Sequence, residues 1–301
     1  MDSSVERAVI VTGAGKGLGA AFARAIASEG AAVLVNNRLR KGQPDSAGAV
    51  ADAIRAQGGR AVANYQDIAA PGAAQVLVKA TLEAFGRIDA IVFNAGIIGP
   101  AAKLPDLDMA ALGEVLNTNF LAQVALAQAA LPHLLQSPAG RMVFVSSSAG
   151  LHGVRGRIPY AASKGALNAM ALTLADELKR TPMKVNVLCP YASTPMTSQD
   201  GVAGDPRLDP AYAAGMATYL ASEACSVNGQ IFLAGGRRYR RARMVEGRGA
   251  SAPDDSSAWV AEHLDRIAAM EGAREFTGAE NAFADLYATI DTSHTGGRGC
   301  D

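Results

Sequence analysis

Several features that mark particular classes of protein are scarce in this chain. Its 301 residues include only three cysteines, which are scattered and show no metal-ligand spacing: Cys189, Cys225 and Cys300. Isolated thiols of this kind are typical of a reducing compartment. No apolar run approaches the length needed to span a bilayer, and the polar first residues leave no room for a secretory signal. We therefore expect a cytoplasmic protein without a metal site.

An excess of charge of either sign is also missing. Lys plus Arg and Asp plus Glu each number 28, so the formal net charge is zero. A balanced chain offers no net attraction to nucleic acid or to an anionic membrane, so we expect neither as a partner. The length suits one large α/β domain followed by a smaller appendage.

The N-terminal region follows the order strand, glycine-rich turn, helix. Residues 8–11 form an apolar run rich in β-branched side chains, TGAGKGLG follows from Thr12, and a periodic alanine-rich stretch continues to Glu29. In this order, glycines permit a tight turn and let a pyrophosphate approach the N–H groups of the helix N-terminus. A glycine run alone is also typical of a flexible loop. The flanking strand and helix, with a second strand at residues 32–35, favour dinucleotide binding.

A second group of residues lies near the middle of the chain. Tyr160 and Lys164 stand four apart in YAASK, so they would share one face of a helix, and Ser147 precedes them in VSSSAG. The Lys164 ammonium would then lower the pKa of the Tyr160 phenol and suit it to proton transfer near neutrality. An ordinary amphipathic helix can carry the same pair, so the spacing alone is weak evidence.

Together these motifs resemble the short-chain dehydrogenase/reductase family, and the likeness runs from about Val5 to Gly236. It rests on motifs that occur in the family order: T-G-x-x-x-G-x-G from Thr12, then Asn94-Ala95-Gly96, Asn119, Ser147, Tyr160 and Lys164. The segments VANYQ, FGRID and SEACSVNGQIFLAGGRRYRRAR are further similar to the dehydrogenase portion of peroxisomal multifunctional enzyme type two and its bacterial relatives.

The resemblance implies an α/β fold, a Rossmann-like doubly wound parallel sheet of about seven strands with helices on both faces. Alternating apolar and helical stretches agree with this fold. We expect strands at residues 8–11, 32–35, 60–64, 90–93, 140–146, 184–188 and 230–233, and helices at 49–57, 72–85, 108–135, 160–178 and 211–222. Residues 1–236 would form the NAD(P)-binding domain and residues 237–301 a C-terminal extension.

Catalytic roles also follow from the resemblance. Tyr160 would exchange a proton with the substrate oxygen, Ser147 would hydrogen-bond that oxygen, and Lys164 would hold the nicotinamide ribose. Asn119 would anchor a water that links Lys164 to solvent, with Asn117 as the alternative in the run NTN. The implied substrates are secondary alcohols and ketones, such as 3-hydroxyacyl thioesters or hydroxysteroids.

The family pattern also implies a larger set of cofactor-binding residues: Gly13, Lys16, Gly17, Leu18, Gly19, Asn37, Arg38, Asp67, Ile68, Asn94, Ala95, Gly96, Lys164 and Thr194. Asp67 and Ile68 would hold the adenine edge, although Asp67 could instead cap a helix and Asn94 could be a turn residue. Thr194 would reach the nicotinamide carboxamide. It arrives about one residue early for the family, and Tyr191 replaces the usual glycine.

The end of the second strand bears on the choice of cofactor. Asn37 stands where NAD-selective members of the family carry Asp, and Arg38 stands where NADP-selective members often carry Arg. A guanidinium and the nearby Lys16 ammonium complement a 2′-phosphate, so we expect NADP, with NAD as the alternative. Arg38, Arg40 and Lys41 could equally form a solvated cluster on a loop.

The extension begins with a crowd of arginines: Arg237, Arg238, Arg240, Arg241, Arg243 and Arg248. They fit a phosphorylated substrate such as coenzyme A, or a solvated hairpin that packs on a neighbouring subunit. Residues 257–270 are expected to form one helix, over the active site or at a subunit contact, and residues 291–301 a flexible tail. The family resemblance implies a homodimer or homotetramer.

The sequence thus predicts an NADP(H)-dependent oxidoreductase that acts on a small-molecule alcohol or carbonyl. An NAD-linked alcohol or steroid dehydrogenase is the first alternative. A non-catalytic NADP-binding scaffold is the second, because a fold does not by itself imply a function.

Overall fold

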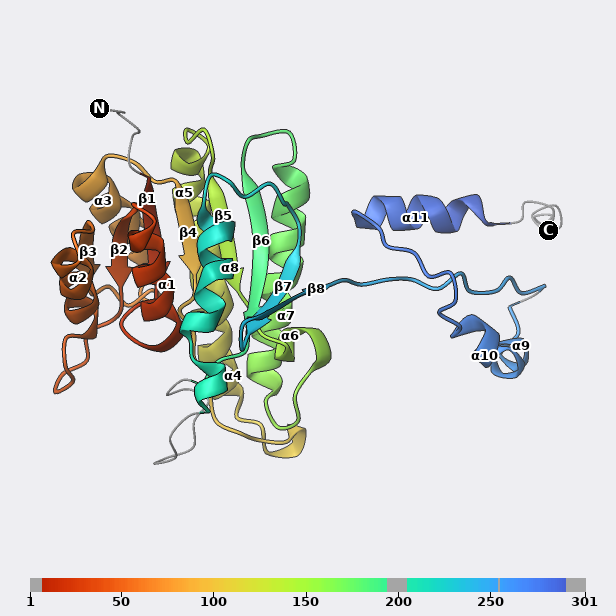
Figure 1. Cartoon of the computed structure of the whole chain (residues 1–301). Coiled ribbons are helices and arrows are strands. Elements are labelled where there is room, and N and C mark those ends of the chain that lie inside the picture. Colours follow the sequence, from red (N-terminus) through yellow and green to blue (C-terminus); the bar gives the residue numbers. More distant parts are fainter. Residues whose placement is uncertain (1–6, 194–204, 254, 291–301) are drawn as a thin grey trace. The chain divides into compact units, whose positions relative to one another are not determined.

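The computed structural model describes residues 7–193, 205–253 and 255–290. The chain divides into two compact units, Met1–Ala242 and Arg243–Asp301. The first unit contains an eight-stranded sheet in the order β3-β2-β1-β4-β5-β6-β7-β8 (Figure 1). Neighbouring strands are parallel except for β7 and β8. This strand order, with helices on both faces, is the Rossmann-like doubly wound fold that the sequence predicts.

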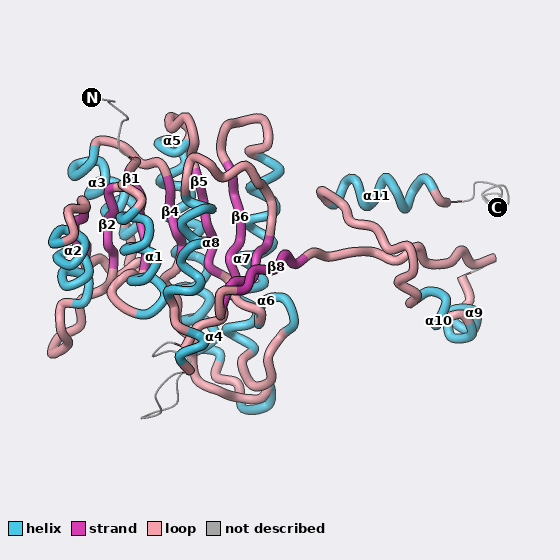
Figure 2. Tube along the Cα trace, in the orientation of Figure 1, coloured by secondary structure: helices cyan, strands magenta, loops and turns pink. Residues whose placement is uncertain are grey.

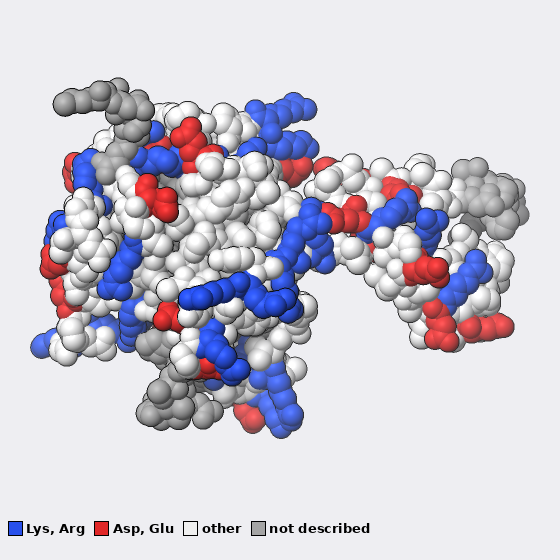
Figure 3. All heavy atoms as spheres, viewed as in Figure 1, with Lys and Arg blue, Asp and Glu red and all other residues white. Residues whose placement is uncertain are grey.

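The strands are β1 (Ala8–Thr12), β2 (Ala32–Asn36), β3 (Ala61–Asn64), β4 (Ala90–Phe93), β5 (Arg141–Val145), β6 (Lys184–Pro190), β7 (Ile231–Gly235) and β8 (Arg238–Ala242). The seven parallel strands agree with the predicted ranges to within about two residues. The eighth strand is arginine-rich and belongs to the segment that the sequence analysis placed in the extension. Its basic side chains gather over the edge of the sheet (Figure 3).

The helices of the first unit are α1 (Gly17–Ser28), α2 (Ser46–Ala56), α3 (Ala73–Phe85), α4 (Met109–Leu116), α5 (Ala122–Leu134), α6 (Ala149–His152), α7 (Ile158–Glu177) and α8 (Ala211–Ala221). Short 3-10 turns occur at η1 (Leu104–Asp106) and η3 (Pro206–Leu208). Figure 2 shows how these helices alternate with the strands along the chain.

The single helix predicted at residues 108–135 is interrupted by a π-helical segment, η2 (Asn117–Leu121), which lies between α4 and α5. The N–H of Ala122 donates to the carbonyl of Asn117, five residues back, in place of the usual four. Such π segments often occur at functional sites. Here the segment contains Asn119, which the family resemblance singles out.

Each face of the sheet buries its own apolar layer. Val9 and Val11 of β1 pack with α1, α2 and α8, whereas Ile10 between them packs with α3, α5 and α7. Successive side chains of a strand point to opposite faces, which explains the alternation. On the second face, Phe93 and Phe144 stack with ring centroids 4.3 Å apart. Because both faces are covered, the strands consist of nearly continuous apolar runs.

The described residues of the second unit form three helices, α9 (Ser257–Glu262), α10 (Leu264–Ile267) and α11 (Ala279–Ala288). The sequence predicts one helix over residues 257–270, but His263 ends α9. Its ring stacks on Trp259 at 4.2 Å and donates to the Trp259 carbonyl at 2.9 Å. The predicted tail at residues 291–301 lies outside the described residues. Within the described ranges, no helix is long and apolar enough to cross a membrane.

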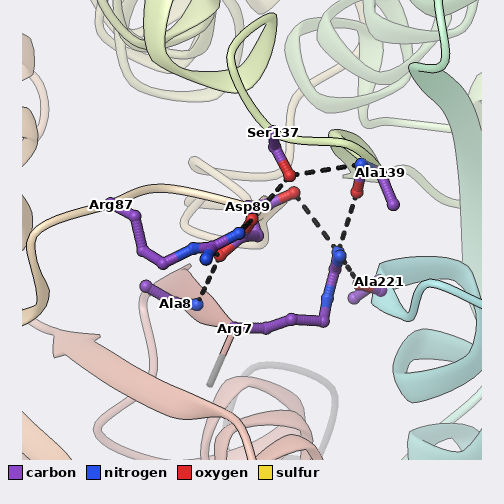
Figure 4. Close-up of polar contacts among 7 residues, drawn as sticks. All are labelled: Arg7, Ala8, Arg87, Asp89, Ser137, Ala139 and Ala221. Carbon is purple, nitrogen blue, oxygen red and sulfur yellow. Dashed lines mark hydrogen bonds and ion pairs between the residues drawn. The ribbon is translucent and has the colours of Figure 1, made fainter. Parts of the chain in front are cut away.

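A buried cluster of charged side chains lies at the amino ends of the parallel strands, where it joins segments that are distant in sequence (Figure 4). Asp89 accepts hydrogen bonds from Ala8 N–H at 2.9 Å, Ser137 Oγ at 2.5 Å and the Arg87 guanidinium at 2.7 and 2.6 Å. Arg7 donates to backbone carbonyls that precede β5 and end α8. Burial acts to raise the pKa of Asp89, but the hydrogen bonds and the charge of Arg87 outweigh it and lower the pKa.

Replacing Asp89 with Asn keeps the shape of the side chain but removes the buried counterion of Arg87. We expect the free energy of unfolding to fall by about 2–4 kcal/mol, measured by urea denaturation at neutral pH. Because the folded pKa is depressed, the stabilisation is present above the ordinary value of 3.8 and is lost as pH falls through the folded pKa. The difference between wild type and variant should therefore shrink on acidification.

Asp176→Asn is a suitable control, because Asp176 forms an exposed ion pair with Lys179. It should change the free energy of unfolding by less than about 0.5 kcal/mol. A loss below about 1 kcal/mol for Asp89→Asn would show that the buried cluster is not a stabilising element.

Candidate active site

A pocket lies at the carboxyl ends of the central strands of the first unit. Its lining includes every predicted catalytic and cofactor-binding residue except two. Asn119 is buried outside the lining, and Thr194 lies outside the described residues. The sequence analysis did not single out the other lining residues, most of which end or follow strands: Asn36, Gln66, Ile97, Thr118, Val145, Ser146, Pro190 and Ala192.

The glycine turn between β1 and α1 leaves no space for side chains at two positions. Gly13 has a φ of +64°, and a Cβ there would lie 2.8 Å from the Cα of Ala95. At Gly19 a Cβ would lie 2.3 Å from the Gly13 carbonyl oxygen and 2.5 Å from Asn94 Nδ2. Lys16 at the N-cap of α1 makes no side-chain capping bond. The first N–H groups of α1 therefore remain suited to an anion such as a pyrophosphate.

Asn94 supports this turn from the neighbouring strand. Its Nδ2 donates to the carbonyls of Thr12 at 2.9 Å and Gly13 at 3.2 Å. In return, Thr12 Oγ1 accepts the N–H groups of Asn94 at 3.0 Å and Ala95 at 3.1 Å. Both amide donors of Asn94 are thus engaged by the turn, and its side chain connects the ends of β1 and β4.

Charged groups follow β2 and β3 on another side of the pocket. Arg38 Nη1 donates to Asp67 Oδ2 at 2.9 Å, and Asp67 Oδ1 accepts the N–H of Ala69 at 3.1 Å. Burial acts to raise the pKa of Asp67, but these hydrogen bonds and the charges of Arg38 and Arg40 outweigh it and lower the pKa. Arg38 therefore lies in the pocket lining as a cation that already has an acidic partner.

The predicted catalytic side chains meet where α7 contacts the end of β5. Lys164 Nζ donates to the Val145 carbonyl at 2.7 Å, and Ser146 Oγ donates to the Lys164 carbonyl at 3.0 Å. Ser147 follows directly in the chain, and the Tyr160 ring centroid lies 5.8 Å from Lys164 Nζ. Ser147, Tyr160 and Lys164 all line the pocket, and the helical spacing predicts a shared position for Tyr160 and Lys164.

Burial opposes charge on both titratable groups of this trio. It raises the pKa of Tyr160, and a hydrogen bond with Ser147 offsets only part of the effect. It lowers the pKa of Lys164 to about 8. The predicted lowering of the Tyr160 pKa by Lys164 is therefore wrong: burial raises this pKa, and the ammonium contacts the Val145 carbonyl. Cys189 is buried nearby, and burial raises the pKa of its thiol to about 11.

Asn119 is fully buried and is held by protein groups. Its Nδ2 donates to the Ile97 carbonyl at 2.8 Å and to Ser163 Oγ at 3.0 Å, and its Oδ1 accepts the Ile97 N–H at 2.7 Å. Both amide donors are used, so a water bound here would have to donate to an oxygen of Asn119. The alternative, Asn117, is exposed. Sequence reasoning missed Ser163, although it directly precedes Lys164.

Gly19→Ala tests the close packing of the turn. The added Cβ would overlap the Gly13 carbonyl, so we expect a loss of about 1–3 kcal/mol in the free energy of unfolding and weaker NADPH binding. Gly113→Ala is the control, because a Cβ at this position on α4 meets open space and should stabilise the helix by up to about 1 kcal/mol. Equal effects of the two substitutions would contradict the proposed packing.

Lys164→Met tests the cost of the buried ammonium. Below the folded pKa of about 8 the wild type pays for desolvating this charge, and the cost disappears as pH rises towards the ordinary value of 10.5. We expect the variant without cofactor to be about 1–2 kcal/mol more stable than wild type near pH 7, with the gain shrinking by about pH 10. Urea denaturation over this range measures it.

Lys79→Met removes an exposed lysine of α3 and serves as the control. Its effect on stability should not change over the same range of pH. If Lys164→Met were less stable than wild type at every pH, burial of the Lys164 ammonium would not lower the free energy of unfolding as we expect.

Comparison with known proteins assigns the chain to the family that the pocket residues indicate. A family model described as short chain dehydrogenase matches residues 7–202. A short-chain type dehydrogenase/reductase of Mycobacterium tuberculosis is 35% identical over 257 residues, which cover 82% of this chain and 88% of that protein. Mouse peroxisomal multifunctional enzyme type 2 is 36% identical over 242 residues, which cover 76% of this chain but only 31% of that protein.

Solved structures agree in fold. A short chain dehydrogenase from Mycobacterium avium has a TM-score of 0.78 at 30% identity, covering 88% of this chain and 97% of that one. A short chain dehydrogenase from Burkholderia cenocepacia, solved in complex with NADP, has a TM-score of 0.68 at 32% identity, covering 77% of this chain and 96% of that one. The chain therefore belongs to the short-chain dehydrogenase/reductase family, whose members are oxidoreductases acting on CH–OH groups.

Proposed function

We propose that this protein is an NADP(H)-dependent oxidoreductase that interconverts a secondary alcohol and a ketone. The observation that carries the proposal is that one pocket is lined both by the glycine turn at the N-terminus of α1 and by Ser147, Tyr160 and Lys164. In a Rossmann-like sheet a dinucleotide lies across the carboxyl ends of the strands. A cofactor in that position reaches from the turn to the catalytic trio.

The pocket fits such a cofactor on structural grounds. The uncapped N-terminus of α1 suits a pyrophosphate, and the close packing at Gly13 and Gly19 holds the turn that precedes it. Asp67 and Ile68 would hold the adenine, and Lys164 the nicotinamide ribose. When bound, the nicotinamide supplies or accepts the hydride.

The end of β2 favours NADP over NAD. The side chain after this strand is the neutral amide of Asn37, which donates to Ser46 Oγ at 2.9 Å and carries no carboxylate to repel a 2′-phosphate. Arg38 and Lys16 supply cations in the same pocket. The complex of the Burkholderia relative with NADP supports this choice.

The protein's own residues would move the proton. In the reductive direction Tyr160 donates its phenolic proton to the carbonyl oxygen, and Ser147 donates a hydrogen bond to the same oxygen as negative charge develops. The phenol of Tyr160 is protonated near neutral pH, which is the form that reduction needs, and burial, which raises its pKa, does not change this.

The substrate class follows from the resemblance to the dehydrogenase portion of multifunctional enzyme type 2. We propose 3-oxoacyl and 3-hydroxyacyl thioesters first and ketosteroids second. The homodimer or homotetramer and the cytoplasmic location remain predictions of the sequence.

Tyr160→Phe tests the proposal directly. The variant keeps the ring but loses the transferable proton, so we expect turnover of 3-oxoacyl thioesters with NADPH to fall by about 100-fold or more. The Kd of NADPH should stay within about twofold, because the phenol is not needed for cofactor binding. Steady-state oxidation of NADPH and fluorescence titration measure the two quantities.

Tyr219→Phe, an exposed position on α8, is the matched control and should retain wild-type turnover. Turnover with NADH but not NADPH would contradict the choice of cofactor. Tight cofactor binding without turnover of any thioester or ketosteroid would instead favour a non-catalytic NADP-binding protein.

A further inference from the structure

The ion pair of Arg38 and Asp67 lies inside the cofactor pocket. Both residues line it, and their side chains are 32% and 39% exposed, respectively. The guanidinium is therefore accessible to a ligand while one of its N–H groups is already bound to the carboxylate at 2.9 Å. In the proposed function this guanidinium is the group that would meet the 2′-phosphate of NADP.

Hydrogen bonds between the ends of β2 and β3 hold the two partners in register. Asn37 N–H donates to the Asn64 carbonyl at 3.0 Å, and Asn36 Nδ2 donates to Asn64 Oδ1 at 3.0 Å and to the Gln66 carbonyl at 2.9 Å. The Asp67 carboxylate is further fixed by a backbone N–H two residues later, at 3.1 Å. The backbone segments that carry Arg38 and Asp67 are thus held together at the end of the two strands.

A phosphate bound by Arg38 would share the guanidinium with the Asp67 carboxylate. The carboxylate occupies one donor group and places a negative charge near a second anion, and both effects weaken phosphate binding. The neutral 2′-hydroxyl of NADH experiences no such repulsion. Resting on the proposed function, we propose that Asp67 is a specificity-determining residue that weakens the preference for NADP conferred by Arg38, so that the protein binds both nicotinamide cofactors.

This role can be separated from an adenine contact by Asp67. NADPH and NADH carry the same adenine, so loss of an adenine contact changes both Kd values by the same factor. Loss of the carboxylate charge changes chiefly the Kd of NADPH. The ratio of the Kd of NADH to the Kd of NADPH therefore reports the proposed effect alone.

The test is Asp67→Asn, which keeps the size of the side chain and an acceptor for Arg38 but removes the charge. Fluorescence titration with NADPH and NADH gives both Kd values for the wild type and each variant. We expect the ratio to rise by about threefold or more in Asp67→Asn, the size expected for a partly exposed charge interaction. In an Arg38→Gln background, the same substitution should raise the ratio by a smaller factor, because the guanidinium that the carboxylate shares is gone and only the direct repulsion of the phosphate remains.

Asp52→Asn is the matched control, because it removes an acid of α2 that pairs with Arg55 outside the pocket lining. It should leave the ratio unchanged, and thermal unfolding shows whether each variant is folded. An unchanged or lower ratio in folded Asp67→Asn would overturn the inference, as would an equal rise in the Arg38→Gln background. Failure of the wild type to bind either cofactor would overturn the proposed function itself.

Discussion

Two hydrogen bonds between α7 and the end of β5 hold the candidate active site together. Lys164 Nζ donates to the Val145 carbonyl, and Ser146 Oγ donates to the Lys164 carbonyl. Ser147 follows on the strand side, and Tyr160 lies one turn earlier on the helix. Fixing Lys164 against the strand therefore fixes the whole trio. The Lys164 ammonium is buried, which lowers its pKa to about 8, and it lies where the proposed chemistry needs a cation.

The amino and carboxyl ends of the parallel strands carry buried charge in different ways. At the amino ends, Asp89 is fully enclosed and satisfied by Arg87 and by hydroxyl and backbone donors, which suits a structural role. At the carboxyl ends, Lys164 has a backbone carbonyl as its contact, and Arg38 and Asp67 are partly open to ligand. Buried charges that stabilise the fold and charges suited to a ligand are thus separated by the length of the strands.

Local sequence patterns predicted the strands and the glycine turn, because these depend on short-range chemistry, whereas most other pocket residues were predicted from the resemblance to the short-chain dehydrogenase/reductase family. The Tyr160 and Lys164 spacing and the turn at Gly13 to Gly19 both placed their residues in one pocket. Contacts between distant segments were not predictable in this way. The π segment around Asn119 depends on tertiary packing. The antiparallel pairing of β8 with β7 is local, a hairpin that is one of the two alternatives the sequence analysis offers for the arginine-rich segment. The raised pKa of Tyr160 reflects burial, which the helical spacing does not report.

The most direct test of a hydride-transferring pocket is a single-turnover experiment. Enzyme bound to NADPH is mixed rapidly with a 3-oxoacyl thioester, and the nicotinamide absorbance is followed with protiated and C4-deuterated cofactor. A loss of absorbance equivalent to the bound NADPH, slowed by deuterium, is the predicted result. Bound NADPH that keeps its absorbance with every thioester and ketosteroid would contradict an oxidoreductase role for this pocket.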